Sequence, residues 1–316
     1  MKAVVLRGGT IRVEDVPVPV PEEKEALIQI VKAGICNTDL ELHEGYMDFQ
    51  GILGHEFVGQ VVETPEKAWL GKRVVGEINL PCGRCPICLE GDPKHCPSRK
   101  VLGIQRKNGV FAEYATLPLE NLHVLPGKVS DVEGVFVEPL AAAIDVFDEI
   151  CVGSQDEVLV LGDGKLGLLV SLVMRSRSPH VFCVGRHPRK LALLEGKGIQ
   201  TAQNIRTWDR KFDVVIEATG VPGGIADALG HVKPKGVVIA KSTFRGMAKI
   251  DLSSLVVNEI RLIGSRCGSF VKALDFLERE PVVLEEMVDA EFPLEDAGKA
   301  FERAKDPETI KVLLSP

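Results

Sequence analysis

Four cysteines lie close together in the sequence, at Cys82, Cys85, Cys88 and Cys96. Four thiolates can complete a tetrahedral shell around one zinc ion, and a complete shell leaves no position open for a substrate. The spacing therefore predicts a structural zinc site, so the residues that carry chemistry are expected elsewhere in the chain.

Two plainer interpretations of this cluster are disulfide bonds and unpaired buried thiols. The chain has eight cysteines, an even number that would suit a disulfide framework. A chain of 316 residues, however, is long enough to form hydrophobic cores without such bridges. Residues 1–9 also lack the long apolar run of a signal peptide. We therefore expect a cytoplasmic protein whose thiolates bind metal.

Outside the cluster, four further side chains could bind a metal. Cys36, His55, Glu56 and Glu138 offer one thiolate, one imidazole and two carboxylates. These suffice for a zinc ion with one open position. Taken singly, each has a structural explanation, because a lone cysteine commonly packs as a small hydrophobic side chain.

Residues 162–167 read Gly-Asp-Gly-Lys-Leu-Gly, a GxGxxG pattern. The pattern follows an apolar strand predicted over residues 157–161 and opens a helix predicted over 165–176. In this context the first glycine permits a tight turn, the second lets the backbone approach a pyrophosphate, and the third allows close packing of the helix. The pyrophosphate would lie at the positive N-terminus of that helix. The dinucleotide-binding residues predicted here are Gly162, Gly164, Lys165, Leu166 and Gly167.

The next predicted strand, residues 180–184, indicates which dinucleotide to expect. An NAD site usually carries an acidic residue at the end of this strand, where it binds the ribose hydroxyls. Here the strand is followed by Gly185 and Arg186, with Arg189 close behind. A 2′-phosphate would fit beside Gly185 without repulsion and could pair with Arg186. The sequence therefore favours NADP(H) over NAD(H), the alternative being that the basic residues form a solvated helix start.

The pattern of predicted elements changes near residue 138. Before it, short β-branched runs separated by Gly and Pro predict an antiparallel, β-rich, barrel-like unit. After it, apolar strands alternate with helices, the first predicted over residues 140–150, which is typical of a parallel sheet covered on both faces. The last segment, residues 288–316, leaves this alternation and could return to the first unit. The strands predicted in the second half span residues 157–161, 180–184, 213–218, 236–240 and 261–264.

Composition excludes two classes of protein. With 38 basic and 45 acidic residues the net charge is −7, and no long basic run is present, so nucleic-acid binding is not expected. The longest apolar stretch, residues 158–174, is interrupted by Asp163 and Lys165, so no membrane-spanning helix is expected either.

These motifs, in this order, resemble the zinc-dependent medium-chain dehydrogenase/reductase family over essentially the whole chain. The resemblance implies a mixed α/β protein with a GroES-like, β-rich catalytic domain and a doubly wound parallel Rossmann domain, with the active site in the cleft between them. The implied boundaries are 1–137 and 281–316 for the catalytic domain, including a structural zinc lobe at 82–96, and 138–280 for the Rossmann domain. The matching segments are Gly-Ile-Cys-Asn-Thr-Asp (34–39), Gly-His-Glu (54–56), the cysteine cluster (82–96), Glu-Pro-Leu-Ala (138–141) and Gly-Asp-Gly-Lys-Leu-Gly (162–167).

By the same resemblance, Cys36 and His55 are ligands of a catalytic zinc ion. Glu138 stands where the alcohol dehydrogenases of the family place a second cysteine. A glutamate there resembles the polyol, threonine and sugar dehydrogenase branches, in which it ligates directly or through water and Glu56 can exchange onto the metal. Thr38 would pass on the substrate proton.

Two neighbouring acids also bear on the site. Asp39 would orient the zinc-binding histidine. In many members of the family a histidine stands five residues after the zinc cysteine and ends the proton relay, whereas here that position is Glu41. A glutamate there resembles the archaeal glucose dehydrogenases, which often use NADP, and this favours a sugar or polyol substrate.

The resulting expectation is an oxidoreductase with about two zinc ions per chain. It would transfer a hydride between a small sugar, polyol or secondary alcohol and NADP(H), as a homodimer or homotetramer. Ala218, Thr219, Gly264, Ser265 and Arg266 resemble segments that line the nicotinamide, although both segments could be ordinary strand-end turns. The alternatives are a catalytically silent dinucleotide sensor or scaffold on the same fold and an NAD-dependent dehydrogenase of simple alcohols.

Overall fold

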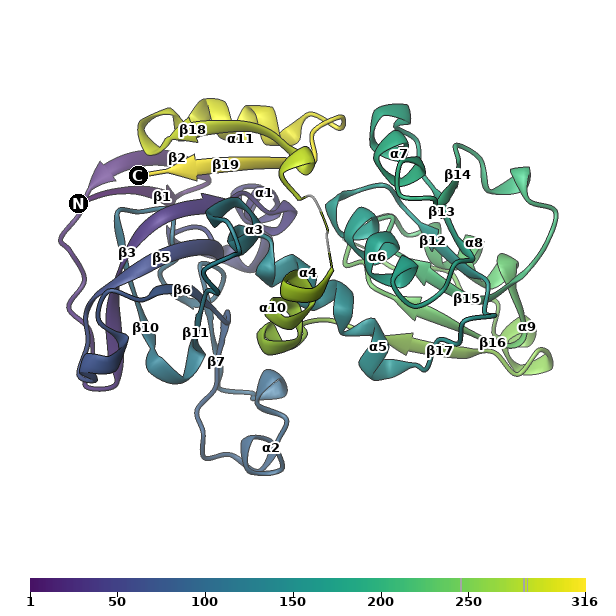
Figure 1. Cartoon of the computed structure of the whole chain (residues 1–316), viewed down its shortest axis with the longest axis horizontal. Helices are drawn as coiled ribbons and strands as arrows, with labels where there is room; N and C mark the ends of the chain where they lie inside the picture. Colours follow the sequence, from purple (N-terminus) through teal and green to yellow (C-terminus); the bar gives the residue numbers. More distant parts are fainter. Residues whose placement is uncertain (245, 281, 283) are drawn as a thin grey trace. The chain divides into compact units, whose positions relative to one another are not determined.

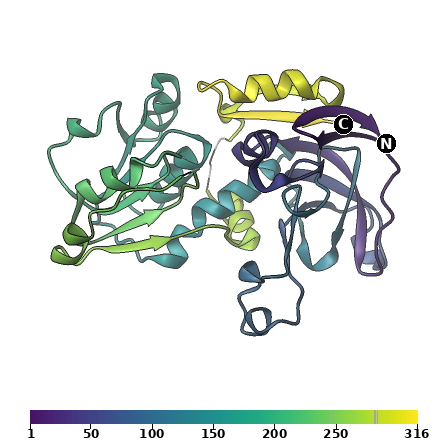
Figure 2. The same cartoon turned by 180° about the vertical axis from the view of Figure 1, so that it is seen from behind.

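A computed structural model of the chain describes residues 1–244, 246–280, 282 and 284–316. The chain forms two compact units. Unit 1 consists of Met1–Glu138 and Ala273–Pro316, and unit 2 consists of Pro139–Lys272. Both ends of the chain lie in unit 1 (Figures 1 and 2). Residue 281, the predicted point of return to the first domain, lies outside the described residues.

Unit 1 is mainly β-structure, as the short β-branched runs predicted. Helix α4 (Val137–Ile144) begins at its boundary with unit 2, and helix α10 (Phe270–Arg279) contains the point of return. The other helices are α1 (Asn37–His43), α2 (Pro86–Leu89), α3 (Asp131–Val135) and α11 (Ala297–Lys305). The strands are β1 (Lys2–Arg7), β2 (Thr10–Asp15), β3 (Glu25–Gly34), β4 (Gly51–Ile52), β5 (Glu56–Glu63), β6 (Arg73–Gly76), β7 (Asn79–Leu80), β8 (Lys100–Leu102), β9 (Arg106–Lys107), β10 (Tyr114–Pro118), β11 (Leu122–Val124), β18 (Val288–Pro293) and β19 (Lys311–Ser315).

Strand β3 is the centre of the main sheet of unit 1. The sheet order is β11-β6-β5-β3-β19-β18, and β10 also pairs with β3. Strand β5 runs antiparallel to β3, with Glu56 opposite Gly34. The C-terminal strand β19 is also antiparallel to β3, with Leu313 opposite Gly34. The end of β3 therefore collects residues from three distant parts of the sequence.

Two smaller sheets complete unit 1. Strands β2, β1 and β4 form one sheet, over a small core of Ala3, Val5, Ile52 and Ala112. Strands β7, β8 and β9 form the other and carry the segment with the four cysteines, which includes α2.

Unit 2 is a parallel sheet with the order β14-β13-β12-β15-β16-β17. Counted along the unit, this is the order 3-2-1-4-5-6 of doubly wound dinucleotide-binding folds. The order reverses between β12 and β15, and ligands of such sheets bind beyond the carboxyl ends of the strands at that point. The elements are α5 (Val146–Glu149), β12 (Val158–Leu161), α6 (Lys165–Arg175), β13 (Val181–Val184), α7 (Pro188–Glu195), β14 (Gln200–Ala202), β15 (Phe212–Glu217), α8 (Gly224–His231), β16 (Val232–Ala240), α9 (Leu252–Val257) and β17 (Arg261–Gly264).

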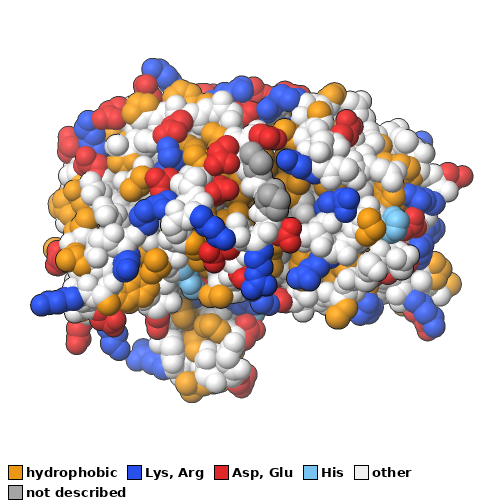
Figure 3. All heavy atoms as spheres, in the orientation of Figure 1, with side chains coloured by type: hydrophobic (Ala, Val, Ile, Leu, Met, Phe, Trp, Pro, Cys, Tyr) orange, Lys and Arg blue, Asp and Glu red, His pale blue; other side chains and the backbone are white. Residues whose placement is uncertain are grey.

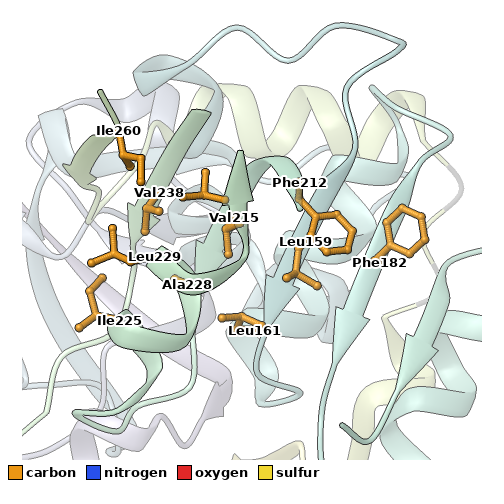
Figure 4. Close-up of a cluster of buried hydrophobic side chains, with 11 residues drawn as sticks. Leu159, Leu161, Phe182, Phe212, Val215, Ile225, Ala228, Leu229, Val238 and Ile260 are labelled. Atoms are coloured by element: carbon orange, nitrogen blue, oxygen red, sulfur yellow. The ribbon is translucent and has the colours of Figure 1, made fainter. Parts of the chain in front are cut away.

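A buried hydrophobic cluster joins this sheet to helix α8. Leu159, Val215 and Val238 come from three neighbouring strands, and Ile225 and Leu229 come from the helix (Figure 4). Strand β12 is buried along its whole length, because helices cover both faces of such a sheet. This is why its sequence is a continuous apolar run and does not alternate.

Two predicted elements differ from the structure. The helix predicted over residues 140–150 begins earlier and is divided at Asp145 into α4 and α5. Asp145 is buried, and its carboxylate accepts hydrogen bonds from residues 265 and 266. The strand predicted over 236–240 begins at Val232, with a register shift in its pairing with β15.

The surface carries charges of both signs. In each unit, acidic and basic side chains are interspersed on the face shown in Figure 3. Within the described part of the chain, no helix has both the length and the hydropathy required to cross a bilayer.

Candidate metal centres and cofactor site

The four cysteines of the segment 82–96 converge, with their sulfurs within 4.8 Å of one another. The Sγ atom of Cys85 lies 3.4 Å from that of Cys88 and 3.8 Å from that of Cys96. A zinc tetrahedron with bonds of about 2.3 Å has edges of about 3.8 Å, whereas the sulfurs of a disulfide are about 2.05 Å apart. All eight cysteines are free. The geometry therefore fits one zinc ion and does not fit disulfides.

The thiols of this cluster differ in acidity. Backbone N–H groups of Arg84 and Cys85 lower the pKa of Cys82 to about 6. Burial and the neighbouring thiols of Cys85 and Cys96 raise the pKa of Cys88 to about 12. Negative charges this close disfavour one another, and a metal ion among them reverses that effect.

A second group contains Cys36, His55 and Glu56, whose ligand atoms all lie within 4.8 Å of one another. Cys36 immediately precedes helix α1, whereas Glu56 is the first residue of β5 and His55 immediately precedes it. The pairing of β3 with β5 brings the two segments together, because Gly34 lies opposite Glu56. Three ligands of these types leave a fourth position for a substrate, as in catalytic zinc sites.

Asp39 fixes both segments of this group. Its Oδ2 accepts the backbone N–H of Cys36 at 2.8 Å, and its Oδ1 accepts the backbone N–H of Gly54 at 3.2 Å. The same Oδ1 lies 3.4 Å from Nδ1 of His55, and neither side chain is more than 3% exposed. A carboxylate in this position orients the ring of a metal-binding histidine.

The surroundings of His55 are anionic. Burial opposes a charge on the ring, but the Asp39 carboxylate and hydrogen bonds with Asp39 and Cys36 raise the pKa of His55 well above its ordinary value. The site thus favours positive charge between the thiol of Cys36 and the carboxylate of Asp39. A metal cation would satisfy the same preference.

A buried lysine completes the group, and sequence reasoning missed it. Lys311, the first residue of β19, forms an ion pair with Glu56, and neither side chain is exposed. Lys311 passes directly over Gly34, where any Cβ would overlap its Cε and Nζ. Burial lowers the pKa of Lys311 to about 8, although the charges of Cys36 and Asp39 act in the opposite direction. No local pattern marks this lysine, because only strand pairing places it here.

The other predicted residues of this site lie at different distances from the group. The hydroxyl of Thr38 is 3.9 Å from Sγ of Cys36. Glu41, one turn further along α1, accepts a hydrogen bond from Nδ2 of Asn37 at 3.0 Å. Glu138 belongs to α4 and is not part of the three-residue group.

The GxGxxG segment connects β12 to α6, which is the context that the sequence predicted. Gly164 caps the N-terminus of α6, and no described heavy atom lies within 4 Å of a Cβ placed there. By contrast, a Cβ at Gly162 would overlap the backbone of Ala218, and one at Gly167 would overlap the carbonyl of Gly162. The loop is therefore tightly packed on one side and open at Gly164, where a pyrophosphate could approach.

The predicted turn at Ala218 and Thr219 is fixed by side chains that the sequence did not single out. Oε1 of Glu217 accepts hydrogen bonds from the N–H and the hydroxyl of Thr219, at 2.7 and 2.5 Å. The Ser242 hydroxyl donates to the same oxygen at 3.2 Å and accepts the N–H of Gly220 at 2.8 Å. Glu217 is the last residue of β15, and Ser242 lies two residues after the end of β16.

The predicted segment Gly264–Arg266 is held in a similar way. The Ser265 hydroxyl donates to Oδ2 of Asp145 at 2.6 Å. Nζ of Lys241 donates to the Ser265 hydroxyl at 2.7 Å and to the carbonyl of Arg266 at 2.8 Å. The Asp145 and Lys241 side chains are 2% and 1% exposed and lie 3.8 Å apart. A buried charge pair thus fixes this segment.

The surroundings of Gly185 differ from the expectation. Gly185 and Arg186 do follow β13, but a Cβ at Gly185 would overlap the side chain of Asp163. Oδ2 of Asp163 accepts the backbone N–H groups of Arg186 and His187, each at 2.7 Å. A carboxylate therefore lies beside Gly185, so the prediction that a 2′-phosphate would meet no repulsion there is wrong. Sequence spacing could not reveal it, because Asp163 belongs to the preceding loop.

Two family models match the chain. Residues 22–127 match an alcohol dehydrogenase GroES-like domain, and residues 132–315 match a glucose dehydrogenase C-terminus. The chain is an oxidoreductase of the zinc-dependent medium-chain dehydrogenase/reductase family. The predicted family and the predicted mixed α/β fold are thereby confirmed.

Individual relatives of this dehydrogenase span nearly its full length. It is 30% identical to a sorbitol dehydrogenase of Halalkalibacterium halodurans, with 100% of the chain and 99% of the relative covered. It is also 30% identical to an erythritol/L-threitol dehydrogenase of Mycolicibacterium smegmatis, covering 100% and 98%. Among solved structures, a zinc-binding dehydrogenase from Sinorhizobium meliloti bound to NADP superimposes with a TM-score of 0.92, at 29% identity over 100% and 99% of the two chains.

Substitutions in the two cysteine-containing groups of the dehydrogenase should affect different properties, stability in the first group and turnover in the second. Cys88→Ala removes one of the four thiolates of the first group. We therefore expect the free energy of unfolding to fall by more than about 4 kcal/mol, which is large for a single substitution. His55→Asn keeps an amide that can donate to Asp39, so we expect a folded protein without turnover. Thermal unfolding, zinc content and activity of both variants check this. A stable Cys88→Ala protein whose only defect lay in the chemical step would contradict a structural role for the four-cysteine group.

Substitutions of Glu56 and Lys311 should have strongly non-additive effects on stability. Lys311→Met leaves a buried carboxylate without its cation, and we expect a loss of about 3–5 kcal/mol in the free energy of unfolding. The double variant Glu56→Gln/Lys311→Met, which carries neither charge, should recover most of that loss. Denaturant unfolding of zinc-loaded samples measures both. Equal stability of Lys311→Met and the parent protein would show that the pair contributes nothing.

Proposed function

We propose that this dehydrogenase transfers a hydride between a polyol, sugar or secondary alcohol and NADP(H). The observation that carries the proposal is the presence, in one chain, of a group of four thiolates and a second group of three ligands, which would leave the fourth coordination position of a zinc ion to a substrate. A silent binding module on the same fold would not require the second group. We propose one zinc ion in each.

The relatives support a hydroxyl-rich substrate. By name, the first acts on sorbitol and the second on erythritol and L-threitol. In this chain Asn37 and Glu41 follow Cys36 on α1 and bring an amide and a carboxylate to the same helix. Such groups can donate to and accept from the additional hydroxyls of a polyol.

The residues of unit 1 would act on the substrate hydroxyl. Cys36 and His55 would hold the zinc ion, with Glu56 or Glu138 as the carboxylate ligand. Zinc bound there would lower the pKa of the substrate hydroxyl. The Oγ1 atom of Thr38, 3.9 Å from Sγ of Cys36, would accept the released proton and pass it to solvent or to a nearby acid.

The residues of unit 2 would hold the cofactor, whose nicotinamide exchanges the hydride. The pyrophosphate would lie at Gly164, against the N-terminus of α6. The turn at Thr219 and the segment at Ser265 would line the nicotinamide. Their hydrogen bonds to Glu217 and Asp145 keep both in place before the cofactor binds.

NADP(H) is the proposed cofactor. Gly185 brings no acidic side chain of its own to the ribose, and Arg186 and Arg189 follow it with exposed side chains. The Sinorhizobium meliloti relative is bound to NADP. The carboxylate of Asp163 opposes this preference, because it places a negative charge beside Gly185.

A homodimer is the proposed minimal assembly, with a homotetramer as a pair of dimers. Strand β17 stands at the edge of the unit 2 sheet. Helix α9, just before it, exposes Leu252, Val256 and Val257 by 67%, 69% and 80%. Exposed apolar side chains next to an unpaired sheet edge suit association with a second copy.

A cytoplasmic location is also proposed. All eight cysteines are free thiols, and the two candidate metal groups use five of them. Thiolate ligands persist best in a reducing compartment.

Substrate preference and zinc content test the proposed activity together. The zinc-loaded protein should contain about two zinc ions per chain and should oxidise polyols or sugars with higher kcat/KM than simple primary alcohols. Reduction of NADP+ and NAD+ can be followed by absorbance across a panel of substrates. Turnover confined to simple primary alcohols would contradict the substrate class. A protein with about one zinc ion and no turnover would indicate a silent dinucleotide-binding relative.

Arg186 should distinguish the two cofactors. Arg186→Ala removes a charged partner of the 2′-phosphate, so the KM for NADP+ should rise about 10- to 100-fold while the KM for NAD+ changes little. Arg261→Ala, at the amino end of β17, is a matched control for the loss of one surface charge. An equal rise in KM for both cofactors would contradict the assignment.

A further inference from the structure

The second residue of the GxGxxG segment, Asp163, makes an unusual set of contacts. Its Oδ2 accepts two backbone N–H groups, from Arg186 and His187. Nδ1 of His187 lies 3.0 Å from Oδ2 and 3.1 Å from Oδ1 of the same carboxylate. The Asp163 and His187 side chains are 8% and 17% exposed. The carboxylate is therefore held at the turn between β13 and α7.

This position is the one from which dinucleotide folds usually read the ribose. In an NAD site the acid that binds the 2′-hydroxyl stands at the end of the second strand. In this chain the residue there is Gly185, and the side chain of Asp163 occupies the space into which any side chain at 185 would project. A side chain at position 185 would therefore displace that of Asp163. The strand end has no acid of its own, and the glycine-rich loop places the carboxylate of Asp163 beside it.

The same contacts bear on a 2′-phosphate. The N–H groups of Arg186 and His187 lie just before helix α7, where backbone donors and the helix dipole favour an anion. The Asp163 carboxylate already takes both donors. A phosphate would have to approach a like charge there without those two hydrogen bonds.

We propose that Asp163 is a specificity-determining residue for the 2′ position of the cofactor. Its carboxylate favours the 2′-hydroxyl of NAD(H) and disfavours the 2′-phosphate of NADP(H), while the exposed Arg186 acts in the opposite direction. The selectivity of the enzyme is the balance between these two groups. This inference rests on the proposed dinucleotide binding.

Asp163→Asn removes the negative charge of the side chain and keeps its shape. The amide oxygen of asparagine can accept the same two N–H groups, and its NH2 can donate to Nδ1 of His187, so the turn is retained while the negative charge is lost. Titration calorimetry on the full-length, zinc-loaded protein would give the Kd of NADP+ and of NAD+ for the parent, Asp163→Asn and Arg186→Ala.

We expect Asp163→Asn to shift the ratio of the two Kd values about tenfold toward NADP+, and Arg186→Ala to shift it toward NAD+. Asp163→Ser, a smaller neutral acceptor, provides a second measurement if Asp163→Asn yields little folded protein. An unchanged ratio, or equal weakening of both cofactors, would overturn the role of Asp163 while leaving dinucleotide binding intact. A parent protein that binds neither cofactor would overturn the proposed function as well.

Discussion

One buried carboxylate holds together the part of unit 1 that can bind a catalytic metal. Asp39 bonds to the backbone of Cys36 on one side and of Gly54 on the other, and it lies against the ring of His55. A carboxylate without exposure is stable only when its oxygens are satisfied in this way. The two segments that carry the thiol and the imidazole are therefore fixed to each other through a residue that need not touch the metal.

The buried groups around this carboxylate include both acidic and basic side chains. The thiol of Cys36, Asp39 and Glu56 attract positive charge, and Lys311 supplies part of it from the far end of the sequence. Buried charges are costly when unpaired, so the return of the chain to unit 1 has an electrostatic as well as a packing role. Without strand β19, the main sheet would lose a strand and Glu56 would lose its cation.

In unit 2, polar side chains fix the turns at the carboxyl ends of the parallel strands. Asp163, Glu217 and Asp145 each accept hydrogen bonds from a neighbouring loop. Preformed turns lose less conformational freedom when a ligand binds, which leaves more of the interaction energy for affinity. At Asp163 these hydrogen bonds also bear on cofactor selectivity, because the carboxylate that fixes the turn carries a charge that acts on a charged cofactor.

The sequence by itself determined the family, the β-rich and doubly wound halves, and five strands of unit 2, because apolar periodicity and the GxGxxG and cysteine spacings are local patterns; it missed the short edge strand β14. It also singled out Cys36, His55 and Glu56, which the structure brings together, while their roles stay predictions. Only the tertiary structure decided that Lys311 reaches Glu56 and that Asp163 lies against Gly185. These contacts join residues from separate elements through strand pairing and loop packing, and no short-range pattern in a single sequence records them.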